Sequence, residues 1–234
     1  MKSTVELMPR MMVNPWFAAL PVRERRTLLG ASEMLKLQPG EMLFRQGDPV
    51  PAGQGALFGL VRGRFKVSSL REDGKEAILA VLEAGNWFGE ISLIDEKPRT
   101  HDATAMGAAE VLVLPRRTFD ELMQTRAFSQ AICRMLAART RSLYGMVEDA
   151  TLRSTRARVA RRLLLLARGD ATQAPGARAV VPVSQEALAM MLGLTRQTLS
   201  KELRILSDCG GVTLGYGRIE IVSASALEKL GAAA

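Results

Sequence analysis

The chain has 234 residues, of which 47% are hydrophobic and 24% are charged. This composition is typical of globular proteins and excludes an intrinsically disordered one, and the length suits two small domains. The formal net charge of +8 favours a polyanionic partner, either nucleic acid or an anionic membrane. No apolar run approaches the ~20 residues that span a bilayer, so we expect a cytoplasmic protein without membrane attachment.

The positive charge is concentrated in about a quarter of the chain. Residues 139–204 contain twelve Arg or Lys and five Asp or Glu, a net charge of +7. Such clustering indicates a nucleic-acid surface, although a solvated helix face would give the same count. Cys133 and Cys209 lie far apart without a pairing pattern. They therefore suggest a reducing compartment rather than a disulfide framework.

The first half of the chain contains short apolar segments separated by glycine-rich turns. These segments predict strands at residues 35–37, 42–44, 56–61, 65–67, 77–82 and 111–114. Short strands at this spacing are typical of an antiparallel sandwich or barrel.

The second half of the chain changes to helical patterning. Apolar residues recur at three- or four-residue steps along residues 126–150, which predicts one helix of roughly 40 Å. Its apolar stripe needs a partner, either the barrel or a second copy of the helix. We favour the second copy, because paired seams suit such stripes, and therefore expect a homodimer.

Two more helices follow the long one. Ser154 is expected to cap a helix over residues 155–167, and a loop covers residues 169–178. Residues 184–206 read SQEALAMMLGLTRQTLSKELRIL. Ser184 and Thr195 suit two N-caps, and Gly193 permits the tight turn between the helices. This segment predicts a helix-turn-helix, and the hairpin expected over residues 212–222 makes it a winged one.

The outward face of the second helix has the side chains that read DNA. Arg and Lys can bond guanine and Gln can bond adenine in the major groove, whereas Gln185 and Thr198 suit phosphate contacts. Thr195, the expected N-cap, is also a candidate DNA-binding residue. An ordinary helical hairpin with a polar face is the simpler alternative. The candidate base-reading residues are Arg196, Gln197, Ser200, Lys201 and Arg204.

A second candidate site lies at residues 88–100, which read FGEISLIDEKPRT. The stretch Gly89, Glu90, Ile91 and Ser92 can form a helical turn whose N–H groups point at an anion. Arg99 can pair with a phosphate, and Thr100 adds a hydroxyl. A buried salt bridge between Glu90 and Arg99, with no ligand, is the structural alternative.

From about residue 16 to residue 222, the chain resembles the family of the cyclic-AMP receptor protein and the fumarate-nitrate-reduction regulator. The resemblance implies an α+β protein with a β-roll sensor (16–125), a dimerisation helix (126–150) and a winged helix-turn-helix (153–230). It places Arg196, Gln197, Ser200 and Lys201 at base-reading positions. The cyclic-AMP branch usually has Arg-Glu and then Arg there, so we expect an altered half-site.

The same resemblance makes Gly89, Glu90, Arg99 and Thr100 part of a phosphate-binding cassette. Leu143 and Tyr144 occupy the positions that contact the nucleotide base, where the family usually has hydroxyl residues. Cyclic AMP, cyclic GMP and cyclic di-GMP all remain candidate effectors, as does none at all.

These observations predict a DNA-binding transcription regulator controlled by a small effector. The resemblance also implies contact with RNA polymerase through the 169–178 loop and barrel surfaces. Alternatives are a ligand-independent regulator of the same family and a cyclic-nucleotide-binding subunit that acts by protein contact. The sequence has no catalytic constellation, and His101 lacks the neighbours of a metal site, so we expect neither an enzyme nor a metal centre.

Overall fold

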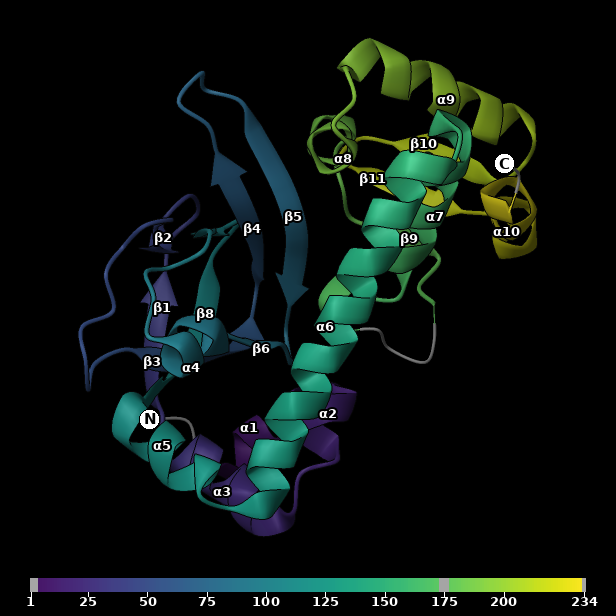
Figure 1. The fold of residues 1–234 in the computed structure, drawn as a ribbon. Coiled ribbons are helices and arrows are strands. Elements are labelled where there is room, and N and C mark those ends of the chain that lie inside the picture. Colours follow the sequence, from purple (N-terminus) through teal and green to yellow (C-terminus); the bar gives the residue numbers. More distant parts are fainter. Residues whose placement is uncertain (1–3, 173–176, 233–234) are drawn as a thin grey trace. The chain divides into compact units, whose positions relative to one another are not determined.

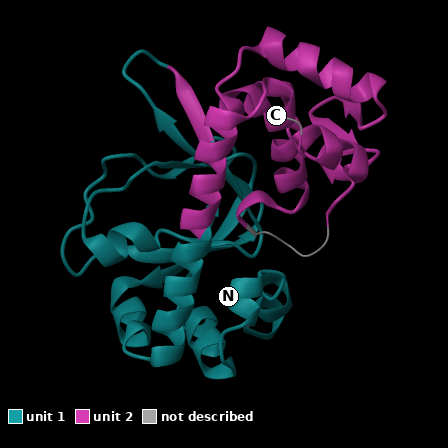
Figure 2. Ribbon diagram, turned by 45° about the vertical axis from the view of Figure 1, so that its right-hand side comes forward, with its two compact units in different colours: residues 1–74, 79–138 teal, residues 75–78, 139–234 magenta. Residues whose placement is uncertain are grey.

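The computed structural model describes residues 4–172 and 177–232. Contacts divide the chain into a first unit, residues 1–74 and 79–138, and a second unit, residues 75–78 and 139–234 (Figure 2). Helices and antiparallel strands share the chain in the order shown in Figure 1, which confirms the α+β class. None of the helices in the described part is long and apolar enough to span a bilayer.

Two four-stranded sheets form the β-roll. Their strand orders are β1-β8-β3-β6 and β2-β7-β4-β5. The pairs β1–β8, β3–β8 and β4–β7 are antiparallel, and Phe58, Leu60, Phe65 and Phe88 belong to one buried cluster. The strands are β1 (Glu33–Leu37), β2 (Met42–Phe44), β3 (Ala56–Arg62), β4 (Arg64–Leu70), β5 (Glu76–Glu83), β6 (Trp87–Phe88), β7 (Asp102–Ala105) and β8 (Ala109–Pro115).

Short helices pack against the roll and the beginning of the long helix. Trp16 donates its indole N–H to the carbonyl of Ala131 at 2.8 Å, and its ring lies 6.1 Å from that of Phe128. These contacts bury the first turns of the long helix, including Ile132. The helices are α1 (Thr4–Met11), α2 (Pro15–Ala18), α3 (Val22–Gly30), α4 (Glu90–Asp95) and α5 (Arg116–Met123).

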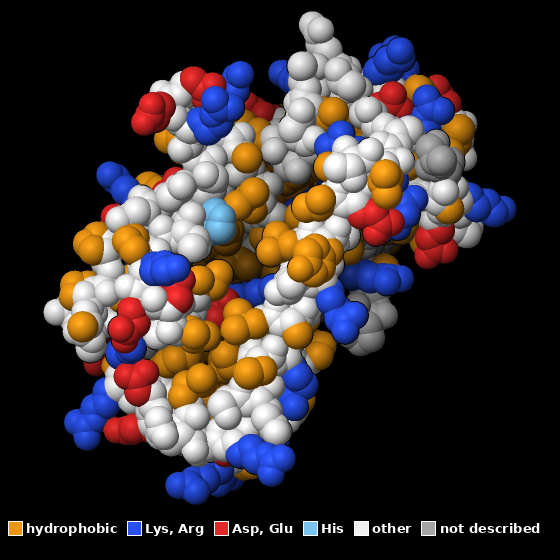
Figure 3. Space-filling view, viewed as in Figure 1, with side chains coloured by type: hydrophobic (Ala, Val, Ile, Leu, Met, Phe, Trp, Pro, Cys, Tyr) orange, Lys and Arg blue, Asp and Glu red, His pale blue; other side chains and the backbone are white. Residues whose placement is uncertain are grey.

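The predicted long helix is confirmed as α6 (Arg126–Leu152). Its buried residues end at Met135. Beyond that point Leu143, Tyr144 and Val147 are 59%, 71% and 61% exposed. Apolar side chains gather along this helix in the space-filling view (Figure 3). The first part of the apolar stripe is therefore covered within the first unit, and the later part is not buried within the chain.

The second unit has a core of its own under a three-stranded sheet of order β10-β11-β9. Leu163, Leu188, Leu199 and Leu203 are fully buried in it. Its last helix was missed, because the Ala-rich tail has only one deeply buried leucine, Leu227. The elements are α7 (Thr155–Ala167), a 3-10 turn (Asp170–Thr172), β9 (Val180–Val181), α8 (Gln185–Leu192), α9 (Arg196–Asp208), β10 (Val212–Gly215), β11 (Arg218–Ile221) and α10 (Ala224–Ala232).

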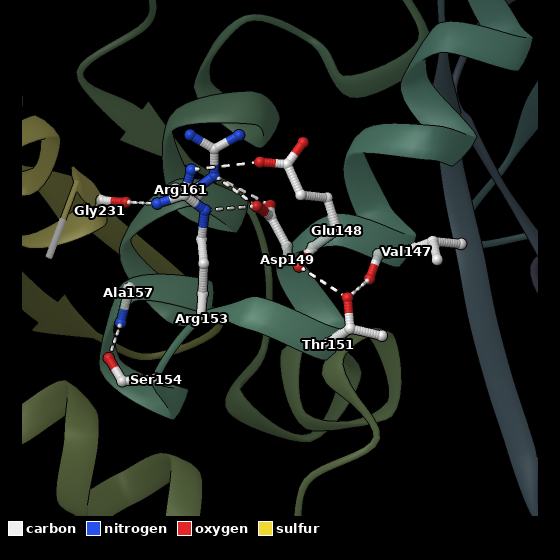
Figure 4. A network of polar contacts seen from close by, with 9 residues as sticks. All are labelled: Val147, Glu148, Asp149, Thr151, Arg153, Ser154, Ala157, Arg161 and Gly231. Carbon is white, nitrogen blue, oxygen red and sulfur yellow. Dashed lines mark hydrogen bonds and ion pairs between the residues drawn. The ribbon is translucent and has the colours of Figure 1, made fainter. Parts of the chain in front are cut away.

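A polar network joins the end of α6, the start of α7 and the last turn of α10 (Figure 4). Asp149 accepts from Arg153 at 2.9 Å and pairs with Arg161 at 2.8 Å. Arg153 also donates to the carbonyl of Gly231 at 2.9 Å. One carboxylate thus fixes the corner where α6 passes into α7.

Candidate nucleic-acid interface and effector cassette

The two helices α8 and α9 form the turn that the sequence predicts. Ser184 accepts from the amide of Ala187 at 3.1 Å, which caps α8. Gly193 ends α8 with φ +64, a left-handed conformation that favours glycine. Thr195 accepts from the amide of Thr198 at 3.1 Å and begins α9. The two N-caps and the glycine turn are therefore found at the residues where the sequence predicts them.

One face of α9 is buried and the opposite face is exposed. Leu199, Leu203 and Leu206 are fully buried. The outward side chains line one shallow surface hollow, and its lining residues are Arg196, Gln197, Ser200, Lys201 and Arg204. Within the described residues, none of the three basic side chains makes an ion pair. The fold thus brings all five predicted base-reading residues together with their donors free to meet a ligand.

The other predicted DNA-binding residues lie at the starts of the same two helices. Thr195 and Thr198 share a hydroxyl contact of 2.9 Å, and half-buried Gln185 begins α8. The sequence predicted the hairpin but did not include its tip among the DNA-binding residues; there Tyr216 is 105% exposed beside exposed Arg218. The Gly-Tyr-Gly turn was the available signal, because an aromatic residue between glycines at a hairpin tip has no core to enter.

The arginines of α7 refine the interpretation of the charge cluster. Their guanidinium groups bind acceptors inside the second unit, so four of the twelve basic side chains are engaged in the fold, three of them with carboxylates that the net charge of +7 already subtracts. The four contacts are Arg156 to Glu202 at 3.0 Å, Arg158 to the carbonyl of Leu192 at 2.6 Å, Arg161 to Asp149 at 2.8 Å, and Arg162 to Asp170 at 2.9 Å.

The candidate effector cassette is a compact turn on the first unit. Gly89 has φ +92 and precedes the six-residue helix α4. A Cβ at Gly89 would lie 2.8 Å from the ring of Phe58, so only glycine fits. Glu90 is 0% and Ser92 is 2% exposed, and the Ser92 hydroxyl lies 3.4 Å from the carbonyl of Pro98.

Arg99 lies under this turn and is 7% exposed. Its guanidinium donates to the carbonyl of Gly89 at 3.0 Å and lies 4.5 Å from the ring centre of Phe44. Burial lowers the pKa of Arg99, and the nearby carboxylates of Glu90 and Asp48 act in the opposite direction. The turn thus holds a buried guanidinium close to the buried carboxylate of Glu90.

The other predicted effector residues differ in their environment. Ile91 is 38% exposed and Thr100 is exposed at the edge of the cassette. Leu143 and Tyr144 lie on α6 within the second unit, so their role as base contacts stays a prediction.

His101, the histidine considered as a metal ligand, directly precedes β7. No group of three or more potential metal-ligating side chains occurs among the described residues. Burial lowers the pKa of His101, and the carboxylate of Asp102 acts in the opposite direction. That carboxylate also accepts from the amide of Gln46 at 2.7 Å.

Comparison with known proteins finds one match to the part that contains the effector cassette and one to the part that contains α8 and α9. Residues 34–126 match the cyclic nucleotide-binding domain, and residues 157–230 match the Crp-like helix-turn-helix domain. The cyclic AMP receptor protein of Thermus thermophilus is 30% identical over 93% of this chain and 96% of its own length. The chain belongs to the cyclic-AMP receptor protein (CRP) family of transcription regulators.

One further relative and one solved structure are also similar to this chain. The CRP-like cAMP-activated global transcriptional regulator of Mycobacterium tuberculosis is 29% identical over 81% of this chain and 86% of its own length. FixK2 from Bradyrhizobium japonicum has the same fold, with a TM-score of 0.74 at 21% identity over 87% of this chain and 98% of that one. The CRP family consists of transcription regulators and not enzymes, and its helix-turn-helix domain implies DNA binding.

Proposed function

We propose that this chain is a homodimeric CRP-family regulator that reads a specific DNA sequence with α9 under the control of an effector in the β-roll. The five outward side chains that line one hollow on α9 carry the proposal. Arg196 and Lys201 supply guanine donors, and Gln197 supplies an adenine partner. Two such helices in a dimer would enter successive major grooves about 34 Å apart.

The deciding experiment is selection of DNA from a randomised duplex pool by the purified full-length protein. Rounds with and without cyclic nucleotides should enrich one near-palindromic site. Enrichment of no sequence under any condition would refute sequence-specific regulation and would favour a subunit that acts by protein contact.

We take cyclic AMP as the first candidate effector, because two relatives are named for it. The support in this chain is the buried side chain of Arg99, which lies close to the buried carboxylate of Glu90 in the turn that follows Gly89. Cyclic GMP and cyclic di-GMP have the same phosphodiester chemistry and are the competing effectors. Leu143 and Tyr144 differ from the usual hydroxyl pair, so the base contact would be apolar or aromatic.

Calorimetric titration with the three nucleotides should show one that binds, and Arg99→Ala should weaken it by about 10- to 100-fold. Loss of a charged hydrogen bond costs about 1.5–3 kcal/mol, which gives this range. Arg117→Ala is the matched control, because Arg117 is 90% exposed and pairs only at the surface with Glu121. Absence of binding by all three nucleotides would favour the ligand-independent alternative.

The proposed dimer seam is the outward face of α6. Its residues are spaced by alternating steps of three and four, as in a coiled coil. None of them belongs to the buried set of α6. The seam residues are Cys133, Leu136, Thr140, Leu143, Val147 and Ala150.

Cys133 makes this seam testable, because equivalent positions face one another in a parallel coiled coil in register. Both cysteines are free and exposed. Diamide should therefore join two subunits through Cys133 in wild type and in Cys209→Ser, but not in Cys133→Ser. The readout is the dimer band on a non-reducing gel. A monomer in sedimentation would contradict the proposed dimer.

Contact with RNA polymerase stays a prediction. The loop over residues 169–178 was its candidate surface, and residues 173–176 lie outside the described part of the chain.

A further inference from the structure

We propose that Arg156 and Arg158 are positioning residues that hold α8 and α9 in the geometry that reads DNA and that neither binds a phosphate. The inference rests on the proposed function. It concerns two basic side chains that the charge pattern would otherwise assign to the DNA surface.

Arg158 caps the end of α8. Its guanidinium donates to the carbonyl of Leu192, the last residue of that helix, at 2.6 Å. The last carbonyls of a helix have no partner within the helix and form the negative end of its dipole. A cation there stabilises the residue at which the chain turns through Gly193 into α9. Arg158, which lies on α7, therefore stabilises the turn between α8 and α9.

Arg156 fixes the second helix. It pairs with Glu202 on α9 at 3.0 Å, and the Glu202 side chain is only 13% exposed. Glu202 directly follows Lys201, and successive residues of an α-helix lie about 100° apart around the axis. Holding Glu202 toward α7 therefore sets the rotation of α9, which decides the direction in which Lys201 points.

The basic side chains of α7 and those of α9 differ in whether their N–H groups already have acceptors within the protein. All four arginines between Arg156 and Arg162 have acceptors inside the second unit. In contrast, Arg196, Lys201 and Arg204 are exposed around one hollow. A phosphate that drew the Arg158 guanidinium away from the carbonyl of Leu192 would break the cap on α8 and release the turn that presents α9.

The salt dependence of DNA binding separates a positioning residue from a phosphate contact. Each lost phosphate contact lowers the slope of log affinity against log salt by about one. Arg158→Ala should weaken binding to the selected duplex by about ten-fold or more, the effect of losing a charged hydrogen bond, and leave the slope unchanged. Arg156→Ala should weaken binding less, because its side chain is 42% exposed, and should likewise leave the slope unchanged.

Matched variants complete the experiment. Arg168→Ala removes one positive charge at the end of α7, where the side chain is exposed, and should behave as wild type in both affinity and slope. A slope lowered by about one in Arg158→Ala or Arg156→Ala would overturn the inference for that residue.

A measurement without DNA keeps this inference separate from the proposed function. The amide of Leu194 donates to the carbonyl of Ala189 at 3.0 Å across the turn. Hydrogen exchange at Leu194 should become faster in Arg158→Ala and stay unchanged in Arg168→Ala, with circular dichroism confirming that both variants fold. Unchanged exchange at Leu194 would overturn the capping role even if DNA binding is confirmed. Selection of no DNA by wild type would refute the function instead.

Discussion

Arg196→Ala and Lys201→Ala should each reduce affinity for the selected duplex by about 1–3 kcal/mol per contact. Each contact occurs twice in a homodimer, so the loss can reach about 2–6 kcal/mol for the complex. Both side chains are exposed on α9 around one hollow, and alanine leaves the buried face of Leu199 and Leu203 unchanged. Fluorescence anisotropy with the labelled duplex measures the effect.

Lys229→Ala is the control for this prediction, because Lys229 is an exposed lysine in the last turn of α10. It removes the same charge from a helix outside the α8–α9 pair. If both α9 variants bound as tightly as this control, α9 would not be the reading helix.

Breaking the Arg162–Asp170 pair should destabilise the protein by about 3–5 kcal/mol, because the buried carboxylate of Asp170 would lose its paired cation. The two side chains are 7% and 9% exposed, and the two terminal nitrogens of Arg162 donate to the two carboxylate oxygens of Asp170 at 3.0 and 2.9 Å. Asp170 also has φ +48, a conformation that its short polar side chain tolerates. Urea unfolding of Arg162→Ala, followed by circular dichroism, measures the loss.

The surface pair Arg117–Glu121 provides the comparison for this experiment. Its side chains are 90% and 62% exposed, and such a pair contributes about 0–1 kcal/mol. Arg117→Ala should therefore leave the urea midpoint almost unchanged. If Arg162→Ala unfolded at the same urea concentration as Arg117→Ala, the buried pair would have no structural role.

Local signals in the sequence predicted the elements that they control directly. Ser154, Ser184 and Thr195 cap helices where expected. The helix expected over residues 126–150 begins at Arg126 and ends at Leu152, two residues beyond the expected end. The strands that were missed are short. Two-residue β6 and β9 are set by their sheet partners, and β7 alternates small residues that have little apolar signal.

The partners of the α7 arginines could not be predicted from the sequence. Arg156 meets Glu202, which lies 46 residues away, and Arg158 meets a backbone carbonyl. Only tertiary packing decides such contacts, and a count of charges treats a paired arginine and a free one alike. For the same reason, the sequence located the exposed face of α9 but did not show which of the other basic side chains are engaged inside the fold.

The network at Asp149 has a practical consequence for anyone who handles this protein. The last turn of α10 is attached through Gly231 and Arg153 to the carboxylate that fixes the corner after α6. A tag or fusion that follows closely after Gly231 would lie beside this contact, and such a reporter should always be compared with the untagged protein.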